Sequence, residues 1–316
     1  MNINKIGMMA SSMILSGMIA KADTFGTGQN IINIDFASVG NAGNGNDVGA
    51  GGGIYSSSYG GVPYDYRLSK YEISQTAINA ATANGLVGMP VGTWVVDQPA
   101  ASINWFQAAG FVNWMNTSTG HEQAYQLNPT LTAITMWSSA DAWQDGGENL
   151  YRNKDAYYFM PSEDEWYKAA YHKNDGVTAN YWDFPTKSNN APVAVGSGTV
   201  AGSAVYHVVA AEPADVSNAG GLSAYETMGQ GGNVWEWMES AYDGVNNSSN
   251  EYRSFRGGCN NNQETYLRSS ARNYDSPIVS DRSIGVRVAS VPEPSTLLLT
   301  ICTSLLIISR RRPRVA

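Results

Sequence analysis

The chain has 316 residues, a formal net charge of −8 and a charged fraction of 15%. Such an acidic chain is a poor partner for nucleic acid or anionic membranes, so we expect neither. Its two cysteines and three histidines show no paired metal-ligand spacing, which argues against a zinc or iron site built on them.

The N-terminal residues are typical of a secretory signal peptide. Lys5 precedes an apolar run over 6–20, and an Ala-Lys-Ala cleavage motif ends at Ala22. We therefore predict a signal peptide over 1–22 that signal peptidase removes after Ala22. A helix buried in the fold is the alternative.

Residues 23–54 are expected to form a strand followed by a glycine-rich segment. Ile32, Ile34 and Phe36 alternate with polar residues, which is the period of a half-buried strand. The glycines of 49–53 lack the Gly-Lys-Ser/Thr ending of a phosphate-binding loop.

Two helices are expected between a second strand at 64–73 and the middle of the chain. Ser74 is a good N-cap for a helix that reaches Ala83, and Asn104 is a good N-cap for the next. The second helix has an apolar face with helical spacing, formed by Trp105, Ala108, Ala109 and Val112.

Ser162 and Glu165 have the spacing of a capping box, which predicts the start of a third helix. The acids Glu163, Asp164 and Glu165 also complement the helix dipole there, and we prefer this interpretation to an acid/base pair. From 174 to 221 the sequence becomes irregular, and we expect long loops with brief strands.

The segment around two tryptophans predicts a strand with two different faces. Trp235 and Trp237 lie two residues apart and share one side, whereas Glu236 faces the other. Gly231 and Gly232 allow a positive φ or a close backbone approach just before this strand.

Four motifs follow one another in the C-terminal third: Gly-Asn-Val-Trp-Glu-Trp at 232–237, Arg-Gly-Gly at 256–258, Arg-Ser-Ser-Ala-Arg at 268–272 and Gly-Val-Arg at 285–287. In this order they resemble the sulfatase-modifying factor family, whose best-known member is the formylglycine-generating enzyme. The resemblance implies a single α+β domain over 55–290 that is similar to the C-type lectin-like fold, with short strands, few helices and long loops.

The resemblance also implies where catalytic residues would lie. The family enzyme holds copper(I) between two cysteines, and those positions are Asn262 and Leu267 here. Cys259 falls at the family's serine, and Cys302 lies in the C-terminal tail. One remaining thiol cannot supply a two-thiolate copper site, so we expect no catalytic residues and no copper.

Family members bind calcium through loop oxygens, which implies two calcium sites. One set would be the backbone of Gly232 and Val234 with the carboxylate of Glu236, and the other would retain Asp215. The family's amide or carboxylate ligands are replaced at Gly229 and Val205. Calcium requires six to eight oxygen ligands, so we expect weak or absent binding.

Arginines and aromatic residues of this region offer a structural and a binding interpretation. We favour buried structural ion pairs for Arg256, Arg268, Arg272 and Arg287. The alternative is ligand binding by Arg256 and Arg272 with Trp237. An aromatic sugar platform is a further possibility for Trp182, Trp237, Tyr266 and Tyr274.

The C-terminal residues 291–316 resemble a PEP-CTERM sorting signal. The motif is Pro292-Glu293-Pro294, followed by an apolar run over 295–309 and an arginine-rich end. The resemblance implies that an exosortase cuts near the motif while the segment lies transiently in the inner membrane. A permanent tail anchor is the alternative.

Together these features predict an exported protein of the cell surface or extracellular matrix, with exopolysaccharide or the cell surface as its partner. We expect a non-catalytic binding or structural module. The alternatives are an oxidase that generates formylglycine in sulfatases and a glycan-binding, lectin-like protein.

Overall fold

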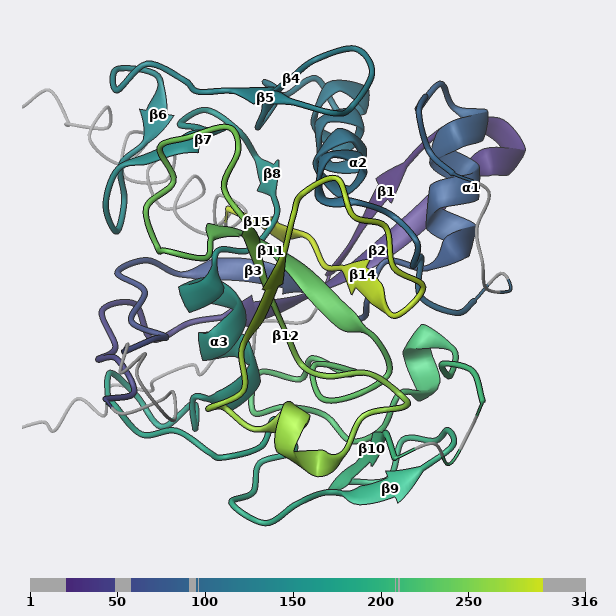
Figure 1. Cartoon of the computed structure of the whole chain (residues 1–316), viewed down its shortest axis with the longest axis vertical. Helices are drawn as coiled ribbons and strands as arrows, with labels where there is room; N and C mark the ends of the chain where they lie inside the picture. Colours follow the sequence, from purple (N-terminus) through teal and green to yellow (C-terminus); the bar gives the residue numbers. More distant parts are fainter. Residues whose placement is uncertain are drawn as a thin grey trace, which may run out of the picture.

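The structure is a computed structural model that describes residues 21–48, 58–90, 95, 97–207, 209 and 211–291. Short strands and three α-helices in these residues surround one main hydrophobic core (Figure 1). Most of the predicted signal peptide and the residues Pro292, Glu293 and Pro294 lie outside the described residues. Within the described part, no helix combines the length and apolar character needed to cross a membrane.

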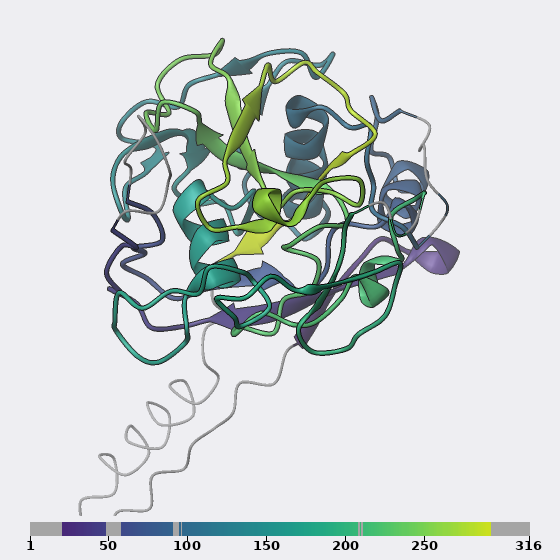
Figure 2. The same cartoon turned by 60° about the horizontal axis from the view of Figure 1, so that its bottom comes forward.

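A five-stranded antiparallel sheet joins the two ends of the described chain. Its strand order is β1-β2-β3-β15-β8. The strands are β1 (Lys21–Phe25), β2 (Ile32–Val39), β3 (Tyr66–Ser69), β15 (Ala289–Ser290) and β8 (Tyr158–Phe159). Figure 2 shows β1 and β2 along one face of the molecule, with helices α2 and α3 on one side of them. Residues 21–39 are therefore part of the same sheet as the last described strand.

Asp23 anchors the first strand to this sheet. Its carboxylate pairs with Arg67 Nη2 at 2.6 Å and accepts a hydrogen bond from the hydroxyl of Tyr158 at 2.8 Å. Ala22 is exposed and lies one residue before Asp23. Cleavage after Ala22 would therefore leave the anchoring residue in the mature chain.

A second, four-stranded sheet carries most of the family motifs. Its order is β13-β12-β11-β14, and β11 and β14 run parallel. The strands are β13 (Asn273–Asp275), β12 (Arg253–Arg256), β11 (Trp235–Ala241) and β14 (Ile284–Val286). The predicted tryptophan strand is confirmed as β11.

Three two-stranded ribbons occupy the loops between these sheets. They are β4 (Gln126–Leu127) with β5 (Ile134–Thr135), β6 (Ala142–Trp143) with β7 (Asn149–Asn153), and the parallel pair β9 (Val193–Val195) with β10 (Ser203–Val205). Three 3-10 helices are η1 (Gly28–Asn30), η2 (Val216–Asn218) and η3 (Glu264–Leu267). The expected loops of 174–221 are confirmed. The ribbons before Asn153 were not predicted, because strands of two residues carry almost no periodic signal.

All three predicted helix starts are confirmed. Helix α1 (Gln75–Ala83) is capped by Ser74, α2 (Trp105–Ser118) by Asn104, and α3 (Glu163–Tyr171) by Ser162. The strand predicted at 64–73 is shorter, since pairing with β2 ends at Ser69.

Helix α2 is more deeply buried than one apolar face suggests. Eleven of its residues are buried, including the polar Asn113 and Asn116. Their amides bond backbone groups of neighbouring segments, with Asn113 Nδ2 2.8 Å from the carbonyl of Tyr125 and Asn116 Nδ2 2.8 Å from that of Tyr158. The polar face of the helix therefore holds adjacent loops in place instead of meeting solvent.

Ser162→Ala should lower the free energy of unfolding by about 1 kcal/mol, because the Glu165 amide loses its capping oxygen. In the structure Ser162 Oγ accepts from that amide at 3.2 Å. Urea denaturation measures the change. Ser139→Ala is the matched control at an exposed position and should shift stability by less than ~0.5 kcal/mol. Equal effects of the two substitutions would contradict a capping role.

Candidate functional site

The centre of the motif region is strand β11 and the turn before it. Trp235 and Trp237 share one side, where both contact the ring of Phe255, at centroid distances of 5.3 and 5.2 Å. Gly232 has φ of +87°, and a Cβ there would overlap the carbonyl oxygen of Val205. This close approach to the chain of β10 confirms why glycine precedes the strand.

Glu236 lies on the opposite side of β11 in a buried ion pair with Arg287. Arg287 Nε lies 2.8 Å from both carboxylate oxygens, and neither side chain is exposed. The indole Nε1 of Trp166 donates to Glu236 Oε2 at 2.6 Å. Arg287 also donates to the carbonyls of Ser69 and Met228. The pair thus ties β11 to α3 and to the end of β3.

A second buried carboxylate, Glu72, lies in the same cluster. Asn233 Nδ2 donates to it at 2.6 Å, and the amide of Val234 donates at 3.3 Å. Burial raises the pKa of Glu72 well above its ordinary value, the neighbouring charge of Glu236 raises it further, and Arg287 opposes both. A single arginine thus offsets the charge of two buried carboxylates, Glu236 by direct hydrogen bonds and Glu72 by its neighbouring positive charge.

The positions implied for calcium are brought close together. The backbone N–H of Ala214, the residue before Asp215, donates a hydrogen bond to Asn233 Oδ1 at 2.8 Å. However, both oxygens of Glu236 accept hydrogen bonds from Arg287, so this carboxylate does not fit a calcium ion in the observed arrangement. Across the described residues, no group of three or more His, Cys, Asp and Glu side chains could hold a metal ion.

The turn after the Arg-Gly-Gly motif contains the positions implied for copper. Cys259 is 2% exposed, and its Sγ donates to Asn261 Oδ1 at 3.0 Å. Asn262 Oδ1 accepts the amide of Cys259 at 3.0 Å, while Leu267 is fully buried in an apolar cluster. Burial raises the pKa of the Cys259 thiol. Amide and leucine side chains at the two positions do not fit a thiolate-bound copper(I) ion.

Arg256 and Arg272 converge on one carboxylate, that of Glu163. Arg256 Nε and Arg272 Nε each lie 2.7 Å from Glu163 Oε1, and Arg272 Nη2 lies 2.7 Å from Oε2. Burial opposes ionisation of Glu163, but the two arginines outweigh it and lower its pKa. The predicted structural ion pairs are confirmed for these arginines and for Arg287. Arg268 differs, because it is 43% exposed and lies 3.8 Å from Asp183.

A third buried centre was missed by sequence reasoning. Arg152 on β7 lies between two carboxylates, with Nη2 3.0 Å from Glu165 Oε2 and 2.7 Å from Glu239 Oε2. No motif marks Arg152, so only the folded chain identifies it. The capping interpretation of the first turn of α3 was incomplete for the same reason: Glu163 and Glu165 are also ion-pair partners.

Trp237 does not belong to the predicted aromatic platform. Trp237 is fully buried, and its Nε1 donates to the carbonyl of Ile103 at 3.1 Å. Tyr266 contacts Trp235, whereas Tyr274 packs against Tyr242. Trp182 lies near Lys173 on the loop after α3. The burial of Trp237 removes it from the platform, because a platform ring must face solvent.

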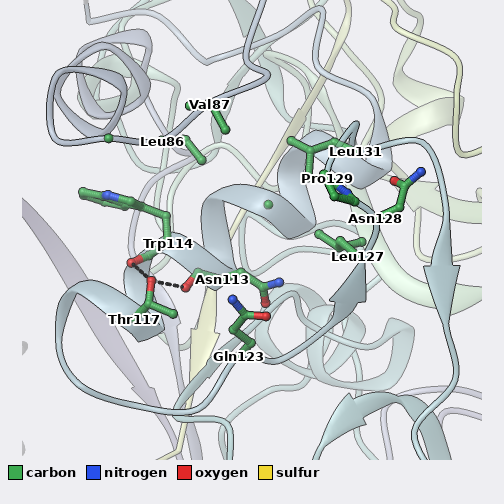
Figure 3. A pocket seen from close by; sticks show the side chains of 12 residues that line it. Leu86, Val87, Asn113, Trp114, Thr117, Gln123, Leu127, Asn128, Pro129 and Leu131 are labelled. Atoms are coloured by element: carbon green, nitrogen blue, oxygen red, sulfur yellow. Dashed lines mark hydrogen bonds between the residues drawn. The ribbon is translucent and has the colours of Figure 1, made fainter.

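Two of the cavities in the described part of the chain have a tryptophan in their walls. Figure 3 shows a surface groove of about 270 Å³ between α2 and the β4–β5 ribbon, where Leu86, Trp114, Leu127 and Leu131 meet polar side chains such as Asn113. A second cavity of about 220 Å³ lies beside β6 and the start of α3, and we call it the Trp143 pocket. Its principal lining residues are Tyr64, Trp143, Glu148, Arg152, Asp164 and Asn246.

Asp164 makes this second cavity sensitive to pH. Burial raises its pKa from 3.8 to about 6, although the amide of Gly60 donates a hydrogen bond to it at 2.8 Å. A raised carboxyl pKa means that the folded state binds more protons, so the contribution of Asp164 to stability should be lost as pH rises from about 4 to 6. Thermal unfolding of Asp164→Asn should show a smaller decrease over this range than the unsubstituted chain. An unchanged pH profile would contradict the assignment.

Solved structures resemble this fold. Treponema denticola variable protein 1 has a TM-score of 0.60 at 18% identity, and the match covers 87% of this chain and 100% of that chain. CarF has a TM-score of 0.56 at 15% identity, with 82% and 99% covered. PvdO from Pseudomonas aeruginosa has a TM-score of 0.50 at 16% identity, with 85% and 98% covered. At these identities the likeness shows the fold alone, a single α+β domain of C-type lectin-like type.

No curated protein matches the chain. The sulfatase-modifying factor enzyme 1-like domain matches residues 64–291, which contain the tryptophan strand, the three ion-pair centres and the Cys259 turn. This match extends over more than half of the sequence. The chain therefore belongs to the family of the sulfatase-modifying factor enzyme 1-like domain.

Proposed function

We propose that this chain is an exported, non-catalytic binding or structural module of the cell surface or extracellular matrix. The observation that carries the proposal is the chemistry of the Cys259 turn. Asn262 and Leu267 stand at the positions implied for the copper-binding cysteines, and Leu267 is buried among apolar residues. A buried thiol with a raised pKa is a weak nucleophile and a poor metal ligand.

The charged residues of the family motifs support the same proposal. Three arginines of these motifs form ion pairs with buried carboxylates and so connect separate segments of the chain: Arg256, Arg272 and Arg287. The long loops between short strands then carry the exposed polar surface. Binding residues are frequently found on loops that a rigid scaffold positions.

An oxidation assay tests the absence of catalysis. The purified chain is incubated with copper, a reductant, oxygen and a peptide of Cys-x-Pro-x-Arg sequence, and the peptide mass is measured. We expect no conversion of the cysteine to formylglycine. Conversion that disappears in Cys259→Ala would overturn the proposal and favour the alternative, a sulfatase-modifying oxidase.

Export and sorting are part of the proposal and rest on the two ends of the sequence. We expect signal peptidase to cut after Ala22 and an exosortase to cut near Pro292-Glu293-Pro294. Mass spectrometry of the cell-surface species should then detect peptides from Asp23 onward and none from 297–308. Recovery of intact 297–308 would favour a retained anchor.

Calcium should have little effect on stability at micromolar concentration. The physical reason is that Arg287 already occupies the oxygens of Glu236, the strongest ligand implied for the ion. Thermal unfolding with calcium and with chelator should therefore give the same midpoint. A rise of several degrees with micromolar calcium would show that the ion displaces this pair.

A glycan-binding role is the second candidate, and the Trp143 pocket is the observation that favours it. The pocket combines a partly exposed tryptophan with hydroxyl, amide and carboxylate groups. Ligand sites commonly combine apolar walls with a few placed polar groups in this way.

A further inference from the structure

The Trp143 pocket lies at the opposite end of strand β11 from the Cys259 turn. Ser240, near the end of β11, lines the pocket, whereas the turn follows β12 beside the beginning of β11. Gly146 in the β6–β7 turn and Ser162 at the start of α3 complete its walls. The pocket is thus separate from every position that the family motifs imply for catalysis.

Its aromatic wall is rigidly held. Trp143 packs edge-on against Tyr64 at a centroid distance of 5.4 Å and in a tilted arrangement against Phe159 at 5.8 Å. Its indole N–H donates to the carbonyl of Asp145 at 2.8 Å. Arg152 lies 5.2 Å from the centroid of its ring. Trp143 nevertheless remains partly exposed to the pocket. A ring fixed before binding presents its apolar surface at little entropic cost.

The pocket is negatively charged. Asp145, Glu148 and Asp164 contribute carboxylates, and Arg152 is the basic side chain among the described lining residues. The charge of Arg152 is already offset by Glu165 and Glu239. The pocket therefore repels anionic ligands such as uronates or phosphates.

Hydrogen-bond donors are present beside these acceptors. Ser162 Oγ accepts the amide of Glu165 and Ser240 Oγ accepts the amide of Glu163, so each hydroxyl keeps its own proton for donation. A ligand ammonium group only donates hydrogen bonds, so it would leave these two donors unused. A ligand that carries several hydroxyl groups uses both kinds of partner.

The volume of about 220 Å³ limits the size of the ligand. It equals the space of about seven water molecules, which suits one sugar ring and excludes a long chain lying inside. A pyranose has an apolar C–H face for the tryptophan and hydroxyls around its edge for the polar groups.

We propose that the Trp143 pocket binds a single neutral pyranose unit of a glycan, with its C–H face on Trp143 and its hydroxyls on the carboxylates and serines. The inference rests on the proposed function and names the ligand class of the binding module. It places ligand recognition away from the Cys259 turn.

The test uses the full chain with an array of neutral, uronate-containing and amino-sugar oligosaccharides, followed by titration calorimetry of the best neutral ligand. Trp143→Ala should weaken binding about tenfold, because the stacked face is lost. Trp182→Ala is the matched control, since Trp182 is also partly exposed but lies on another loop, and it should leave binding unchanged.

A second variant, at the exposed edge of the pocket, keeps the proposal testable if Trp143→Ala fails to fold. Glu148 is exposed, so Glu148→Gln should fold normally and weaken binding about threefold, because a charge-assisted hydrogen bond becomes a neutral one. Both variants are checked by thermal unfolding before titration.

Several results would overturn the inference. They are no neutral ligand on the array, binding that survives both Trp143→Ala and Glu148→Gln, loss of binding in Trp182→Ala, and a preference for uronates or for amines over neutral sugars. The oxidation assay is independent of these outcomes. Formylglycine production alongside glycan binding at Trp143 would refute only the absence of catalysis.

Discussion

Glu163→Gln should lower the free energy of unfolding by about 3–5 kcal/mol, the usual range when one partner of a buried ion pair is removed. Arg256 and Arg272 both rely on this carboxylate, and Arg256 has no exposed surface. Its Nη2 already has no hydrogen-bond partner among the described residues. The amide of glutamine keeps the shape of the side chain but leaves the buried Arg256 and the partly buried Arg272 without an anion.

Urea denaturation at neutral pH measures this effect. Asp183→Asn is the matched control, because Asp183 is also the carboxylate partner of an arginine. That pair is exposed and 3.8 Å apart, so the control should cost less than about 1 kcal/mol. Comparable losses of unfolding free energy in the two variants would contradict the role of Glu163 as the shared buried partner of two arginines.

Arg287→Met should cost about 3–5 kcal/mol at neutral pH, because Glu236 and Glu72 then share a buried site without any cation. The loss should shrink as pH falls toward 4. Burial already raises the pKa of Glu236 although Arg287 opposes it, and removing Arg287 should raise this pKa further. Protonated carboxyls therefore restore stability at low pH, and ionisation removes it as pH rises.

The double variant Glu236→Gln/Arg287→Met sharpens this prediction. Removing both charges avoids an unpaired buried ion, so the double variant should be more stable at pH 7 than Arg287→Met alone. Arg268→Met, at a 43% exposed side chain, controls for loss of a surface arginine and should change stability little. A double variant less stable than the single one would contradict the buried-charge explanation.

The features that the sequence predicted correctly depend on neighbouring residues. Ser74, Asn104 and Ser162 each cap a helix because the hydroxyl or amide reaches a backbone N–H only three residues further on. Trp235 and Trp237 share a face because strand geometry alternates side chains whatever the partner strands are. Glycine at 232 follows from the same local reasoning, although Val205, which it approaches, could not be named.

The ion-pair partners and the pocket were decided by the tertiary structure alone. Glu163 meets Arg256 and Arg272 across 93 and 109 residues of sequence, and Arg152 meets Glu239 across 87. Sequence by itself determined the helix starts, the tryptophan strand and the wide spacing of Cys259 and Cys302, because each depends on residue type and position along the chain. Only folding decided which charges are buried together and that Trp143 borders a cavity, because both depend on how loops of no periodic pattern pack against one another.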